Sequence, residues 1–149
     1  MSLEVWIKNG WLREHKTSPQ EVTGILDLIE RDLTDASRAE ISTDWRFNIA
    51  YNAGLQLATL VLYVAGYRTG RGESKHYRVI QAFPLVLGQE FVAARDYLDN
   101  CRRKRNVSEY DTAGTISVKE ADDLVRTLRE LKAKIEHWLL KNHTDLYDG

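Results

Sequence analysis

Apolar residues recur every three or four positions along almost the whole chain, which is the period of an amphipathic α-helix and not of a strand. Only two prolines, Pro19 and Pro84, interrupt this pattern, and no repeat, low-complexity tract or flexible linker divides the 149 residues. A chain of this length suits one domain with a sizeable core. We therefore expect a single all-α domain over residues 1–149, with its core at about 19–140, built as an up-and-down bundle of about five helices.

Capping signals and helix breakers divide the pattern. A short helix is expected before Gly10, and longer ones at about 19–40, 44–65, 75–83, 91–106 and 117–140. Ser18–Glu21 and Ser117–Glu120 have the spacing of capping boxes. The helix that begins near residue 75 should kink or end near residue 83, because Pro84 disfavours helical geometry in the residue before it. The helix at 44–65 is apolar around nearly its whole circumference, which predicts a central, buried position.

Composition excludes several classes of protein. The 21 Lys and Arg against 22 Asp and Glu give a net charge of −1, which excludes a polycationic coat for nucleic acid. Cys101 is the only cysteine, so neither a disulfide framework nor a cysteine metal site is expected. No pair of histidines has a carboxylate at ligand spacing, so we predict no metal and no other cofactor.

The sequence also bears on location. The start of the chain has no basic leader followed by an apolar stretch, so no secretory signal is expected. The longest apolar run, at 55–65, is far shorter than the roughly 20 residues that cross a bilayer. We expect a cytoplasmic protein with no membrane association.

Four consecutive cations, from Arg102 to Arg105, form the strongest local anomaly. Without them the net charge would be −5, so they place a positive spot on an acidic body. Cations are favoured at a helix C-terminus by the helix dipole and the free carbonyls, which is one explanation. A phosphate site is the other, because arginines bind phosphate oxygens bidentately and Asn106 can add a hydrogen bond.

The segment Arg105-Asn106-Val107-Ser108-Glu109-Tyr110 resembles the signature of HEPN domains: an arginine, commonly a polar residue after it, and a histidine four to six positions on. The resemblance extends over about residues 19–140, including the segments Asp44-Trp-Arg-Phe-Asn and His76-Tyr-Arg-Val-Ile-Gln. HEPN proteins are typically homodimers in which two motifs meet across a cleft. Many are metal-independent RNases of toxin–antitoxin, abortive-infection or antiviral systems.

The resemblance implies a catalytic role for three residues. Arg105 would hold the scissile phosphate, Asn106 would orient it, and Tyr110 would stand where the family has histidine. A phenol has a pKa near 10, against about 6.5 for imidazole, so roughly one part in a thousand is in the base form at neutral pH. Protonated Tyr110 can still donate a hydrogen bond to phosphate or a proton to a leaving oxygen.

A polar line on the expected central helix gives further candidates. Its members are spaced by four and share one face: Asp44, Asn48, Asn52 and Gln56. Polar groups on a core helix need partners, so the line either bonds to neighbouring helices or borders a cleft. In the second case, Asn52 and Gln56 form the wall of a cleft that contains Arg105.

Other side chains complete the candidate site. His76 begins a helix beside other cations and is expected to bind substrate together with Arg102 and Asn52, although a surface position would also explain it. Arg46 and Tyr51 are secondary candidates, and Tyr51 is alternatively a core aromatic. His15, in the N-terminal segment, carries little weight.

Three functions remain open. The first is an RNase-type toxin that acts on RNA as a homodimer and is controlled by an antitoxin. The second is a noncatalytic HEPN module that binds RNA, a nucleotide or a nucleotidyltransferase partner. The third is a structural dimerisation module without a ligand.

Overall fold

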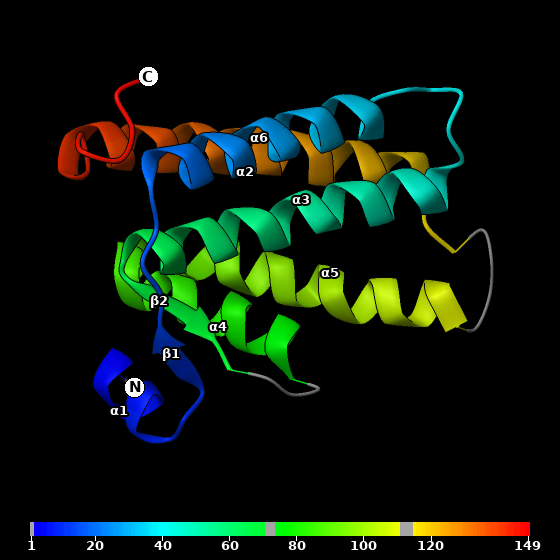
Figure 1. Cartoon of the computed structure of the whole chain (residues 1–149). Helices are drawn as coiled ribbons and strands as arrows, with labels where there is room; N and C mark the ends of the chain where they lie inside the picture. The colour runs from blue at the N-terminus through cyan, green and yellow to red at the C-terminus, as the bar shows by residue number, and fades with distance from the viewer. Residues whose placement is uncertain (1, 71–73, 111–114) are drawn as a thin grey trace.

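The computed structural model describes residues 2–70, 74–110 and 115–149, and it describes only the backbone of residues 107–110. The expected loop at 111–115 therefore lies almost wholly outside the described residues. The described part is an all-α bundle, as predicted, with one small two-stranded sheet (Figure 1). Its helices are α1 (Leu3–Lys8), α2 (Pro19–Ala36), α3 (Thr43–Val64), α4 (Lys75–Leu87), η1 (Gln89–Phe91), α5 (Val92–Tyr110) and α6 (Val118–Asn142).

The four long helices α2, α3, α5 and α6 run alternately up and down, with α3 at the centre (Figure 1). α2 and α6 pack on one side of α3, and α4 and α5 pack on the other. Buried residues occur all around α3, among them Phe47, Tyr51, Leu57 and Leu60, which confirms the predicted central helix. α3 is long and apolar enough to cross a membrane, but 67% of its most apolar window is buried inside the bundle. That burial is typical of a core helix in a soluble protein.

Gly54 sets how closely α5 and α6 approach α3. A Cβ atom built at Gly54 would lie 2.8 Å from Leu98 Cδ2 in α5 and 3.2 Å from Leu128 Cδ2 in α6. Both leucines are fully buried, so neither side chain has free space to move into. The absence of a side chain at this position therefore lets both α5 and α6 pack closely against α3.

Two helix ends differ from the expected ones. α4 does not end near residue 83 but continues through Pro84, which is buried, to Leu87, and it ends where Gly88 adopts a φ of 116°. α2 ends at Ala36 and not near residue 40. Its last turn is closed by Ser37, whose hydroxyl donates to the Leu33 carbonyl over 2.8 Å.

The two expected capping boxes differ. In Ser117–Glu120 both reciprocal hydrogen bonds form at 3.0 Å, as predicted. Ser18 accepts from the Glu21 backbone N–H over 3.2 Å, but the Glu21 carboxylate binds His15 and Thr17 instead, each over 2.7 Å.

The small sheet was not predicted. β1 (Leu12–Glu14) pairs antiparallel with β2 (Tyr67–Thr69), with Leu12 opposite Thr69. This pairing joins the segment before α2 to the segment between α3 and α4. It therefore fixes the positions of these two segments relative to each other.

Candidate functional site

The cations of α5 divide between two faces. Arg103 is 64% exposed and pairs with Asp99 over 2.8 Å, and Lys104 pairs with Glu120 at the start of α6. Arg102 and Arg105 are three positions apart, so they share a face, and this face is turned toward α3 and α4. The four cations from Arg102 to Arg105 therefore do not form a single positive patch on the surface.

Each of the two inward arginines lies over an aromatic ring. The Arg105 guanidinium carbon is 5.4 Å from the ring centroid of Tyr51 in α3, and that of Arg102 is 5.2 Å from the ring centroid of Tyr77 in α4. Both distances are within the range of cation–π contacts. Arg102 Nε also donates to Asp99 over 3.0 Å. These contacts hold two positive charges at the junction of α3, α4 and α5.

His76, in the first turn of α4, lies close to these arginines. Its ring centroid is 6.4 Å from that of Tyr51. Burial lowers the pKa of His76, and the nearby charges of Arg105, Lys75 and Arg102 lower it further. The imidazole is therefore mostly neutral at pH 7 and able to accept a proton. We call the following residues the arginine cluster: Tyr51, His76, Tyr77, Arg102 and Arg105.

The Tyr51 hydroxyl is the least explained polar group of the cluster. Tyr51 is only 1% exposed, and its hydroxyl has no hydrogen-bond partner among the described residues. Burial raises the pKa of Tyr51 to about 12, so the phenol stays protonated and acts as a donor, not as a base. An unsatisfied buried hydroxyl costs about 1–3 kcal/mol.

A groove lies next to the arginine cluster, between α2, α3 and α4. Its volume is about 370 Å³, and its lining includes Ile25, Asn52, Gln56, Thr59, Lys75 and His76. We call it the α2–α4 groove. His76 belongs to both the groove and the arginine cluster, so the two adjoin at this residue.

One buried carboxylate orients two amides of this groove. The Asn52 and Gln56 side-chain nitrogens donate to Asp32 Oδ2 in α2, over 3.2 and 2.8 Å. Asp32 is 5% exposed and also pairs with Arg31 over 3.0 Å. The first alternative for the polar line therefore holds at these two residues, which bond to a neighbouring helix. They also border a groove, but the residues that line this groove do not include Arg105.

The six predicted site residues occupy different places. Arg102, Arg105 and His76 come together, whereas Asn52 lies in the adjoining groove. Asn106 is exposed, about 100° around α5 from Arg105. The helix continues to Tyr110, but that side chain lies outside the described part of the chain.

Arg46, a secondary candidate for the site, has a structural role. It is buried, its Nε donates to the Ala36 carbonyl over 2.7 Å, and it pairs with Asp122 in α6. Arg46 therefore joins the end of α2 to α6.

His15 is a residue whose position the sequence does not reveal. Its ring stacks on that of Tyr63, with centroids 3.9 Å apart, and its Nε2 is 2.7 Å from Glu21. The backbone N–H of His15 donates to the Gly66 carbonyl over 2.9 Å, next to the β1–β2 pairing. A strand of three residues gives too short a pattern to predict this placement.

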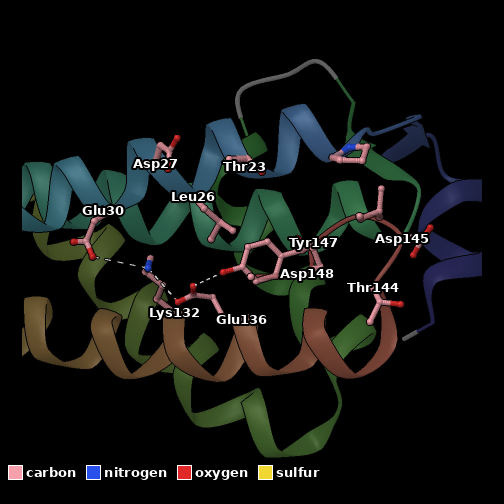
Figure 2. A pocket seen from close by; sticks show the side chains of 13 residues that line it. Thr23, Leu26, Asp27, Glu30, Lys132, Glu136, Thr144, Asp145, Tyr147 and Asp148 are labelled. Carbon is pink, nitrogen blue, oxygen red and sulfur yellow. Dashed lines mark hydrogen bonds and ion pairs between the residues drawn. The ribbon is translucent and has the colours of Figure 1, made fainter.

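A second hollow, of about 460 Å³, lies between α2, α6 and residues 144–149 (Figure 2). Its lining includes Lys132 and five carboxylates: Asp27, Glu30, Glu136, Asp145 and Asp148. Tyr147 donates to Glu136 over 2.9 Å, and Lys132 pairs with the same carboxylate over 3.0 Å. Nowhere in residues 2–70, 74–106 and 115–149 do three potential ligands among His, Cys, Asp and Glu converge to hold a metal ion. The negative charge makes this hollow a poor place for phosphate.

Comparison with known proteins gives no relative: no family model matches the chain, and no curated protein or solved structure matches it either. The geometry of the arginine cluster is therefore the main evidence for the function.

Proposed function

We propose that the protein binds RNA at the arginine cluster and cleaves it as a metal-independent endoribonuclease of the HEPN type. The observation that carries this proposal is the convergence of Arg105 and His76 on the Tyr51 ring, with Arg102 beside them over the Tyr77 ring. Two guanidinium groups offer the donors that a phosphate binds, and a neutral imidazole offers a base.

The proposed reaction is transesterification of the RNA backbone. The 2′ oxygen attacks the adjacent phosphorus while its proton passes to His76 Nδ1 or Nε2, and the bond from phosphorus to the 5′ oxygen breaks. Arg102 and Arg105 stabilise the negative charge that develops on the phosphoryl oxygens. The 5′ oxygen takes a proton from Tyr110, the role that the HEPN resemblance gives to this position. The products are a 2′,3′-cyclic phosphate and a 5′-hydroxyl end.

The biological setting follows from the same resemblance. A second copy of the chain would complete the cleft, and Asn106 would orient the phosphate there. The protein would act in the cytoplasm as the toxin of a toxin–antitoxin or abortive-infection system, with an antitoxin or a nucleotidyltransferase as its partner.

An RNA-cleavage assay in the presence of a chelator tests the proposal. We expect the purified protein to cleave single-stranded RNA, and Arg105→Ala to lower the rate by about 100-fold or more, because it removes a donor to the developing charge. Arg103→Ala is the matched control, since Arg103 is exposed and bonds to Asp99 Oδ2, while Arg102 keeps its own bond to Asp99 Oδ1. Wild-type rates in Arg105→Ala would show that the site is wrong.

A noncatalytic RNA-binding module is the second candidate. It is favoured by the tyrosine at position 110, where the family has histidine. If the native chain binds RNA without cleaving it and Tyr110→His creates cleavage, this second candidate is correct.

A further inference from the structure

The amides of the α2–α4 groove have a fixed orientation. A carboxylate only accepts hydrogen bonds, so the nitrogen ends of Asn52 and Gln56 must face Asp32. Each amide then retains its carbonyl oxygen and one N–H for another partner. Thr59 donates its hydroxyl proton to the Leu55 carbonyl over 2.8 Å, which leaves its oxygen as an acceptor.

The walls of the groove suit a flat, partly apolar ligand. Ile25, Leu55 and Val79 provide apolar surface, and the Tyr63 ring, stacked on His15, provides an aromatic side. The volume of about 370 Å³ lies within the range of small-molecule sites, which combine apolar walls with a few fixed polar groups. Lys75 supplies positive charge, and the neutral imidazole of His76 supplies hydrogen-bonding nitrogens, where the groove meets the arginine cluster.

We propose that the α2–α4 groove binds the adenine base of a nucleotide whose phosphate lies at His76 and the arginine cluster. Adenine presents a donor, its 6-amino group, beside an acceptor, N7, and this is the pair that an Asn or Gln amide reads. Asn52 and Gln56 are the reading groups, and Thr59 adds a second acceptor. The inference rests on the proposed function, because it makes the groove the base pocket of the same RNA site.

Calorimetric titration of the full chain with AMP and with IMP tests this inference. The two nucleotides share ribose and phosphate, but IMP has a carbonyl oxygen in place of the 6-amino group. We expect AMP to bind at least fivefold more tightly, because the oxygen would face the carbonyl oxygens of the amides. Equal affinities, or no binding of AMP, would overturn the inference.

Variants locate the preference in the groove. Asn52→Leu should reduce the ratio of AMP to IMP affinity toward one, while Asp32 keeps its bonds to Gln56 and Arg31. Thr59→Val, which keeps the shape of the side chain, should weaken AMP binding about threefold, and it decides the question if Asn52→Leu does not fold. Thr34→Val is the matched control, because Thr34 is exposed on α2 and bonds to Glu30. Should Thr34→Val weaken AMP binding as much as Thr59→Val, the groove would not be the site.

Arg105→Ala separates this inference from the proposed function. It should weaken AMP and IMP binding by the same factor, since both carry the phosphate, and leave their ratio unchanged. If RNA binding depends on Arg105 but AMP and IMP bind equally, the base pocket is wrong and the phosphate site stands. If AMP is preferred and Arg105→Ala changes nothing, the base pocket stands and the phosphate site is wrong.

Discussion

At the scale of single residues, His76 links the chemistry of the site to the stability of the fold. Burial and three neighbouring cations lower its pKa below the ordinary value of 6.5. The unfolded chain therefore binds a proton at a pH where the folded protein does not. The contribution of this histidine to stability is fully present above pH 6.5, and it decreases as the pH falls below 6.5 toward the folded-state pKa.

His76→Gln should make stability less sensitive to acid. We expect the wild-type melting temperature to fall between pH 7.5 and pH 5.0, and that of the variant to fall less, because the variant has no imidazole to protonate on unfolding. Differential scanning calorimetry at both pH values measures the two shifts. Equal shifts in the two proteins would contradict the lowered pKa.

At the scale of elements, the close packing of α3 against α5 and α6 positions the arginine cluster. Capping residues and apolar spacing predict α3, α6 and the start of α2 well, because these signals are local. The pairing of β1 with β2 and the continuation of α4 through Pro84 depend on contacts between distant segments, which a local pattern does not contain.

A pair of glycine substitutions tests this packing. Gly54→Val should destabilise the fold by about 1–3 kcal/mol, because its side chain would collide with Leu98 and Leu128. Gly24→Ala is the control: Gly24 is also inside a helix, but an added Cβ would meet nothing within 4 Å, so we expect a gain of about 0.4–1 kcal/mol. Urea denaturation gives both values. A Gly54→Val variant as stable as Gly24→Ala would contradict the close approach of the three helices.

At the scale of the whole molecule, the sequence predicts the helical bundle and its central helix but only part of the site. The run from Arg102 to Arg105 is visible in the sequence, yet only the packed helices show that Arg102 and Arg105 lie over aromatic rings of α4 and α3, while Arg103 and Lys104 lie over none in the described part of the chain. Tyr51 looks like a core aromatic, and it is one. Its importance comes from the arginine cluster around its ring, which only the assembled fold reveals.

The most direct test of the account is the affinity for a fluorescent single-stranded RNA, measured by anisotropy over a range of salt concentrations. Binding precedes cleavage, so the test holds for both candidate functions. We predict that Arg105→Ala weakens binding about tenfold or more and reduces the slope of log affinity against log salt by about one, whereas Arg103→Ala stays within about twofold of wild type. Equal effects of the two substitutions, or no RNA binding by the wild-type protein, would contradict the assignment of the arginine cluster as the phosphate site.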